Sequence, residues 1–324
     1  MLVVGKDSFC DYHNIQEAVD SLEQQSSDQA ETLVILSGVY EEEVRIYRSH
    51  LKIIGVGRVE IVMNRYAKER DETGTEIGTF ATPTLFLGGI HLVLDNLLIT
   101  NTAGQGESIG QAIAVYAHCD QTVFRNCTFK GYQDTLFTGP LPPAPKERLE
   151  FGGILLKEHH THYRQLYQNC YIEGTVDFIF GGATAYFDQC EIRSLRHWDN
   201  QAGYISAAST PKGQAHGYVF NNCYLTAEAA ISPVFLGRPW REYAKTVFIG
   251  CHMATHIHPL GWDHWNNAAN EETVQYQEYG VKDATVSRVQ RVPWADCFET
   301  MEVALSQEHI FPDSDFWRRE DNRK

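Results

Sequence analysis

Hydrophobic and polar residues alternate in a short phrase that recurs through the middle of the chain. The phrase is rich in β-branched and aromatic residues and has a Cys near its centre, as in VFRNCTF (123–129), LYQNCYI (166–172), YFDQCEI (186–192), VFNNCYL (219–225) and VFIGCHM (247–253). LVLDNLLI (92–99) fits the same pattern, with Leu97 in the place of the Cys. This alternation predicts that each copy of the phrase is a β-strand.

The copies are spaced like the repeats of a solenoid. Successive cysteines are separated by 43, 20, 33 and 28 residues, counted over Cys127, Cys170, Cys190, Cys223 and Cys251. A repeat of roughly 20 to 30 residues is typical of a stack of coils. The Cys then behaves as a small buried hydrophobe, and the polar residue before it suits a turn or a side-chain ladder between coils. The predicted fold is all-β, a parallel β-helix, because no long amphipathic helix follows each strand as a TIM barrel or Rossmann fold requires.

One segment has a helical pattern instead. In NIQEAVDSLEQQ (14–25) the apolar residues that share one helical face are Ile15, Ala18, Val19 and Leu22. This helix is expected to cap the open N-terminal end of the solenoid. No linker divides the chain, so we expect one domain over residues 1–324, with a loop insertion at about 138–162, where prolines gather.

An aspartate interrupts the apolar run in GTVDFIFGGA (174–183). A carboxylate at Asp177 costs several kcal/mol unless it is paired or its pKa shifts. When two repeats are aligned on their cysteines, residues 126–137 lie over 169–180 without a gap, and Asp134 lies over Asp177. Equivalent positions on adjacent coils are about 4.8 Å apart, so the two pKa values separate and one carboxyl can remain protonated. This pattern favours catalysis over a buried structural Asp.

Arg238 falls into the same phase of the repeat. It precedes Cys251 by 13 residues, as Asp177 precedes Cys190. We therefore expect Arg238 on the same face, a coil or two along, in a position to hold a carboxylate or an anionic substrate.

Amide and aromatic side chains complete the candidate site. Gln111 is expected in the strand one coil before Asp134, and Gln133 is the neighbour of Asp134 in the chain. Amide N–H groups are neutral donors suited to a developing oxyanion. Trp240 and Tyr132 flank the set, and aromatic rings in an open groove commonly stack on sugars.

Charge and cysteine content narrow the possible partners and the compartment. The net charge of −15 disfavours nucleic acids and anionic membranes as partners and says little about a neutral substrate. The first 25 residues show no basic region followed by an apolar core, and no run is long enough to span a membrane. The eight cysteines form no CxxC motif. We expect a cytoplasmic monomer with reduced thiols.

Five motifs in this sequence resemble those of the pectin methylesterase family of carbohydrate esterases. In family order they are GVYEEEV (38–44), GQAIAVY (110–116), GYQDTLF (131–137), GTVDFIFGGA (174–183) and FLGRPW (235–240). GWDHWN (261–266) and YQEYG (276–280) fit the C-terminal part of the family.

The resemblance implies a right-handed parallel β-helix that hydrolyses methyl esters on galacturonate units of pectin or oligogalacturonides. It implies that Asp177 is the nucleophile and Asp134 the general acid and later general base. The remaining implied roles are oxyanion donors at Gln111 and Gln133, orientation of the nucleophile by Arg238, and substrate contact by Trp240. Phe180, beside the nucleophile in its motif, is a further candidate for substrate contact. The resemblance implies no metal or cofactor.

Two alternatives remain open at this point. A glycoside hydrolase also uses two carboxylates, at about 5 to 9.5 Å, but does not need the two amides. The histidine clusters HHTH (159–162) and HMATHIH (252–258) suggest a metal site only weakly, because the first lies in the insertion. The insertion between the two aspartates is expected to form a loop at the rim of the groove and to favour chains of a few sugars.

Overall fold

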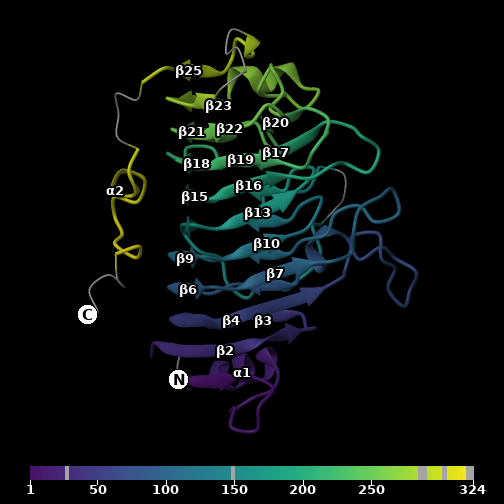
Figure 1. Cartoon of the computed structure of the whole chain (residues 1–324), viewed down its shortest axis with the longest axis vertical. Coiled ribbons are helices and arrows are strands. Elements are labelled where there is room, and N and C mark those ends of the chain that lie inside the picture. Colours follow the sequence, from purple (N-terminus) through teal and green to yellow (C-terminus); the bar gives the residue numbers. More distant parts are fainter. Residues whose placement is uncertain (26–28, 147–149, 284–289, 301–304, 319–324) are drawn as a thin grey trace.

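The computed structural model describes residues 1–25, 29–146, 150–283, 290–300 and 305–318, and its strands stack in parallel into one column (Figure 1). The strands form two sheets, one of 18 strands and one of seven. Successive strands of the chain move from the larger sheet to the smaller one and back, so each circuit adds a coil to the column. This is the predicted parallel β-helix.

The larger sheet consists of two ladders that meet along the column. The first ladder contains β1 (Leu2–Val4), β2 (Glu31–Tyr40), β4 (Leu51–Met63), β6 (Leu92–Asp95), β9 (Thr122–Arg125), β12 (Arg164–Gln168), β15 (Thr184–Asp188), β18 (Tyr218–Asn221), β21 (Lys245–Ile249), β23 (Gln275–Tyr279) and β25 (Asp296–Phe298). The second contains β7 (Leu98–Asn101), β10 (Thr128–Lys130), β13 (Tyr171–Gly174), β16 (Glu191–Ser194), β19 (Tyr224–Ala227), β22 (His252–Met253) and β24 (Lys282–Asp283).

The seven-stranded sheet contains the strands that follow the two aspartates, β11 and β14. Its strands are β3 (Val44–Ile46), β5 (Leu85–Leu87), β8 (Val115–Ala117), β11 (Leu136–Thr138), β14 (Ile179–Gly181), β17 (Gly203–Ala208) and β20 (Val234–Gly237). Leu136 pairs with Ile179 and Phe137 with Phe180, which is the register predicted from the aligned repeats.

The recurring Cys marks the corner between the two ladders. The five repeat cysteines are buried, and each thiol donates to backbone carbonyls of its own and the preceding coil, as Cys190 does to Asp188 and Tyr167 at 3.5 and 3.4 Å. The residue before each Cys, or before Leu97, has a positive φ, which confirms the predicted turn. These residues are Asn96, Asn126, Asn169, Gln189, Asn222 and, as the one glycine, Gly250. We call this set the Asn corner.

The predicted N-terminal cap is confirmed. Helix α1 spans Ile15–Glu23 and lies at the N-terminal end of the column (Figure 1). Its buried residues are the predicted face, Ile15, Ala18, Val19 and Leu22. The carboxylate of Glu42 accepts the backbone N–H groups of Ile15 and Gln16 at 2.9 Å each, which satisfies donors that a helix start leaves unpaired.

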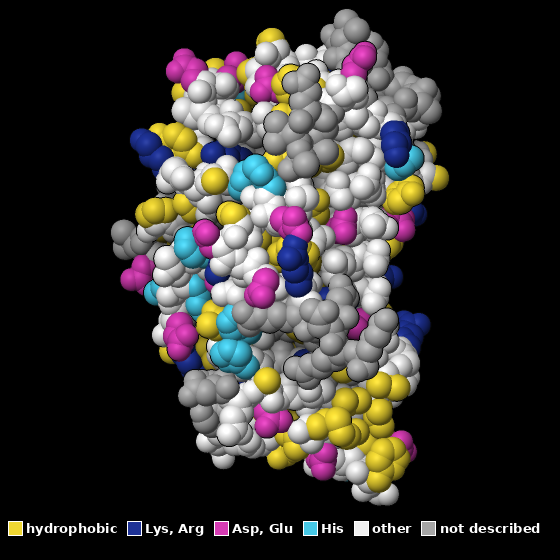
Figure 2. Space-filling model, turned by 90° about the vertical axis from the view of Figure 1, so that its left-hand side faces the viewer, with side chains coloured by type: hydrophobic (Ala, Val, Ile, Leu, Met, Phe, Trp, Pro, Cys, Tyr) yellow, Lys and Arg dark blue, Asp and Glu magenta, His cyan; other side chains and the backbone are white. Residues whose placement is uncertain are grey.

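The C-terminal segment 305–318, with the short helix α2 (Gln307–Ile310), runs along the outside of the larger sheet (Figure 1). Its buried side chains Ile310, Phe311 and Phe316 pack in one cluster with residues of the first ladder. Figure 2 shows this face, where the Lys and Arg side chains of the described residues are scattered among Asp and Glu. Across the described ranges, no helix has the length and apolar character that crossing a bilayer requires.

Candidate active site

Asp134 and Asp177 occupy the same position on adjacent coils, in the connections that lead into β11 and β14. The backbone N–H of Asp134 donates to the carbonyl of Val176 at 3.1 Å. Both aspartates have a positive φ, 66° at Asp134 and 49° at Asp177. Asp177 lies just outside a strand, since β14 begins two residues later, at Ile179. The same positive φ occurs at Asn126 and Asn169 in the Asn corner, so it is a feature of the coil rather than of the site.

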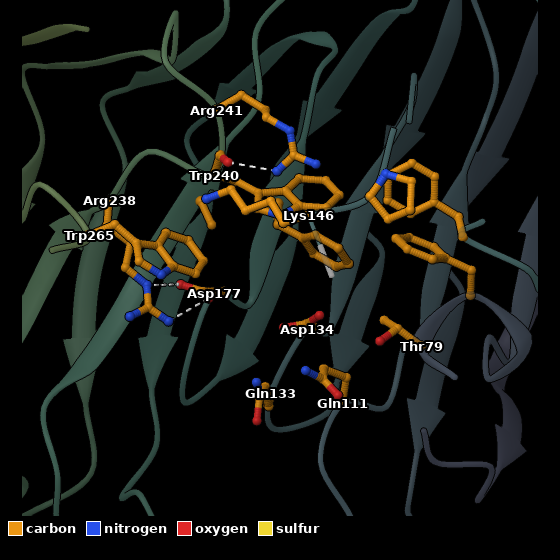
Figure 3. A pocket seen from close by; sticks show the side chains of 15 residues that line it. Thr79, Gln111, Gln133, Asp134, Lys146, Asp177, Arg238, Trp240, Arg241 and Trp265 are labelled. Atoms are coloured by element: carbon orange, nitrogen blue, oxygen red, sulfur yellow. Dashed lines mark hydrogen bonds and ion pairs between the residues drawn. The ribbon is translucent and has the colours of Figure 1, made fainter. Parts of the chain in front are cut away.

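Arg238 holds the carboxylate of Asp177 through two hydrogen bonds. Its Nε donates at 2.8 Å and its Nη2 at 2.7 Å, one to each carboxylate oxygen (Figure 3). Arg238 lies two coils beyond Asp177, as expected. The equal 13-residue spacing to the following Cys, from which this position was predicted, does not mean that the two residues are level. Strand register places Ile179 level with Ser206 and Ser206 level with Gly237, so Arg238 stands three residues further along than Asp177 and its long side chain reaches back.

The two carboxyl groups differ in proton affinity. Asp134 is 7% exposed and Asp177 6%. Burial, reinforced by the neighbouring Asp177 charge, raises the pKa of Asp134 well above its usual range. Burial also raises the pKa of Asp177, but the guanidinium of Arg238 opposes that rise. The charged form is therefore favoured more at Asp177, beside Arg238, than at Asp134.

Gln111 and Gln133 lie side by side near Asp134 (Figure 3). The backbone carbonyl of Gln133 accepts the backbone N–H of Ala112, the neighbour of Gln111, at 3.1 Å. This bond links the connection before β8 to the connection before β11. Gln111 lies in the connection between β7 and β8, so its expected place within a strand is wrong. Among the described residues neither side-chain amide has a hydrogen-bond partner, so their N–H groups are available to a substrate oxygen.

These residues line one cavity of about 340 Å³. Phe180 and Trp240 supply part of its wall, with ring centroids 5.6 Å apart. Tyr132 does not line the cavity, although Gln133 and Asp134 beside it do. Its carbonyl instead accepts the backbone N–H of Thr175 on the next coil at 2.9 Å. The cavity thus gives the predicted substrate contact of Tyr132 no support.

Several lining residues were not predicted from the sequence. They are Thr79, Phe80, Pro145, Lys146, Phe151, Ala207, Arg241 and Trp265. Trp265 lies within the GWDHWN motif and Arg241 directly follows FLGRPW, so both had a signal nearby. The side chain of Trp265 contacts the Arg238 guanidinium, whose carbon is 3.8 Å from the ring centroid.

Within the described part of the chain, no three His, Cys, Asp or Glu side chains are arranged to hold a metal ion. His160 of the insertion makes protein contacts. His160 Nε2 is 2.9 Å from the carbonyl oxygen of Gly88, and the His160 and Tyr163 ring centroids are 5.4 Å apart.

Comparison with known proteins places this chain in a family. The family model described as Pectinesterase matches residues 1–140 and 157–315, leaving out 141–156, which lies inside the expected insertion. The chain belongs to the pectinesterase family. Pectinesterase 31 of Arabidopsis thaliana is 30% identical over 97% of this chain and 92% of its own length. The chain spans only 50% of another Arabidopsis relative, a probable pectinesterase/pectinesterase inhibitor that is 32% identical.

Solved pectinesterase structures share the whole fold. The carrot pectin methylesterase has a TM-score of 0.76 and 27% identity, covering 95% of this chain and 89% of its own. The Erwinia chrysanthemi enzyme has a TM-score of 0.77 and 25% identity, covering 97% of each chain. The chain is therefore a right-handed parallel β-helix. None of these matches supports the glycoside hydrolase alternative.

Proposed function

We propose that this pectinesterase removes methyl esters from galacturonate units with Asp177 as nucleophile and Asp134 as general acid and then general base. The observation that carries the proposal is the two-point hydrogen bonding of Asp177 by Arg238, beside a second carboxyl group on the adjacent coil. A pectin methylesterase with 25% identity over 97% of this chain was solved in complex with a hexasaccharide, which supports an oligogalacturonide as ligand.

In the first half of the reaction, an oxygen of ionised Asp177 attacks the ester carbonyl carbon. The carbonyl electron pair moves onto its oxygen, and the amides of Gln111 and Gln133 donate hydrogen bonds to this oxyanion. When the oxyanion collapses, the bond to the methoxy oxygen breaks and Asp134 gives that oxygen its proton. Methanol leaves, and the sugar acyl group remains on Asp177.

In the second half, Asp134 is a carboxylate and takes a proton from a water molecule. The water oxygen attacks the acyl carbonyl, the bond to Asp177 breaks, and the galacturonic acid is released. Asp134 is then protonated and Asp177 ionised, as at the start. The raised pKa of Asp134 suits both steps, because it favours the protonated acid before methanol leaves and makes the carboxylate that remains a stronger base toward water.

The aromatic wall suits the uncharged part of the substrate. Phe80, Phe180 and Trp240 line the cavity that contains the two carboxyl groups, and the Phe80 ring packs against the other two. Such rings bind a methyl group and the apolar face of a sugar without adding charge.

The test is a comparison of two products from methylated oligogalacturonides. Methanol release without new reducing ends is expected of an esterase, and new reducing ends would indicate glycosidic cleavage. Methanol that is still released at the wild-type rate by Asp177→Asn would refute the nucleophile.

The protein works in the cytoplasm, in reduced form. This part of the proposal is supported by its eight cysteines, all of which lie in the described part of the chain: six are buried and none forms a disulfide. Alkylation under denaturing, non-reducing conditions should modify all eight in protein made in its native cell. Two or more disulfides in that protein would contradict a cytoplasmic site.

A further inference from the structure

The insertion between β11 and β12 forms part of the cavity wall. Pro145, Lys146 and Phe151 line the cavity that contains Asp134 and Asp177. The Phe151 ring packs against Phe80 and Trp240 at centroid distances of 5.4 and 6.2 Å.

Beyond Phe151, the insertion lies over the outer face of the first strands of the seven-stranded sheet. The backbone N–H of Ile154 donates to the carbonyl of Phe80 at 3.1 Å. Tyr47, next to β3, donates its hydroxyl to the carbonyl of Leu155 at 2.9 Å, and Lys157 Nζ is 3.7 Å from the centre of the Tyr47 ring. These contacts hold the insertion on the N-terminal side of the catalytic pair.

A column of aromatic rings lies beneath this cover. Phe86, Tyr116, Phe137 and Phe180 follow one another in strand register, and the first three are 0 to 1% exposed. The next residue of the column is Ala207, whose small side chain leaves room for the cavity. The space for substrate therefore begins where the covered column ends.

The C-terminal side of the pair has a different surface. Tyr204, Phe235 and His258 stack on successive coils, with centroid distances of 5.2 and 4.1 Å. Tyr204 and His258 are only partly buried. The Arg238 guanidinium carbon is 3.9 Å from the centre of the Tyr204 ring, so this row begins at the catalytic site.

Arg241 fixes the insertion at the boundary between the two sides. It donates to the carbonyl of Ala144 and to that of Trp240, each at 2.8 Å. Arg241 and Lys146 both line the cavity, while the chain as a whole has a net charge of −15. A uronic acid chain that enters the cavity from the C-terminal side therefore meets Lys146 and Arg241 at the end of the cavity covered by the insertion.

We propose that the insertion closes the substrate groove on the side of β3, β5 and β8, so that the enzyme attacks esters at the end of an oligogalacturonide. The rest of the sugar chain extends in one direction only, over β17 and β20. This inference rests on the proposed esterase function and defines its substrate class, chains with an accessible end rather than the interior of a long polymer.

The test uses a fully methylated hexagalacturonate with the whole protein. In the wild type, tandem mass spectrometry of the first product should find the lost ester at one and the same end, about tenfold more often than at internal positions. Phe151→Ala, and deletion of residues 141–156, should lower that ratio about tenfold and raise kcat/KM on methylated polymer relative to trimer.

Leu155→Ala is the matched control, because Leu155 belongs to the same insertion, is 72% exposed and does not line the cavity. It should keep the wild-type positional ratio. Wild-type loss at random positions, with normal methanol release, would overturn this inference and leave the esterase function intact. An unchanged ratio in folded Phe151→Ala would also overturn it. Absence of methanol from the wild type would overturn the esterase function and this inference together.

Discussion

Two corners of the coil share one backbone geometry and use it differently. We call the turn that contains Asp134 and Asp177 the Asp corner. The φ angle is 52° at both Asn126 and Asn169 of the Asn corner, and it is 66° at Asp134 and 49° at Asp177. Residues of the Asn corner are mostly exposed, whereas both aspartates are at most 7% exposed. The left-handed turn is a property of the solenoid; what surrounds the turn makes one corner structural and the other reactive.

The contrast lies in the partners of each corner. Asn126 donates its side-chain amide to Asp95 on the preceding coil at 3.0 Å, a contact that supports the stack. Asp177 is bonded by Arg238 from two coils away, and Asp134 has its pKa raised by burial and by Asp177. Changes at the Asp corner should therefore affect rate and pH dependence, and changes at the Asn corner should affect stability alone.

The largest effect is expected from Asp177→Asn. The amide keeps the shape of the side chain but cannot attack the ester, so kcat/KM should fall by about 10⁴-fold or more. Methanol release measures the rate, and circular dichroism checks that the column is folded. A folded variant with near-wild-type turnover would show that Asp177 is not the nucleophile and that the Asp corner is no more reactive than the Asn corner.

Asp134→Asn is expected to lower kcat by about 10²- to 10⁴-fold and to change the pH profile. In the wild type, activity should fall below the pKa of Asp177, which must be ionised, and above the pKa of Asp134, which must be protonated. Because the pKa of Asp134 is the one raised well above its usual range, the variant should lose the alkaline limb and keep the acidic limb. A profile identical to that of the wild type would show that Asp134 does not control it.

The sequence predicted the Asp corner better than the residues around it. Asp134 and Asp177 could be aligned because Leu136 and Ile179 pair in register directly after them. Arg238 was correctly paired with Asp177 through a count that the register does not support, since the connection after β20 is longer than the connection after β14.

The wall of the cavity was beyond prediction for physical reasons. Lys146 and Phe151 lie in an insertion that has no second copy to align with, and their position depends on contacts to distant coils such as that of Phe151 with Phe80. Tyr132 was placed in the groove because it precedes Gln133 and Asp134, but the chain turns at these residues, and only Gln133 and Asp134 line the cavity.

At the Asn corner, Cys190→Ala tests the buried layer beneath the turn. Cys190 is 0% exposed, and its thiol donates to two backbone carbonyls that would lose this contact. The free energy of unfolding should fall by about 1 to 2 kcal/mol, with kcat unchanged. Urea denaturation measures the first quantity and methanol release the second. A loss of activity without a loss of stability would mean that the cysteine column acts on catalysis.

The smallest effect is expected from Asn169→Gly. Asn169 is exposed, and none of the described residues forms a hydrogen bond with its side chain. Glycine adopts a positive φ without strain, but it loses more backbone entropy on folding, so the two contributions nearly cancel and stability should change by no more than about 0.5 kcal/mol. Gly250 already occupies the equivalent turn, with φ at 59°. Asn169→Val at the same site should destabilise the fold by about 1 to 2 kcal/mol, because a β-branched residue is strained there. If both variants unfold at the same urea concentration, the left-handed turn is not what selects the residue at the Asn corner. If Asn169→Gly instead lowers kcat, the two corners are coupled and the division between structure and reactivity fails.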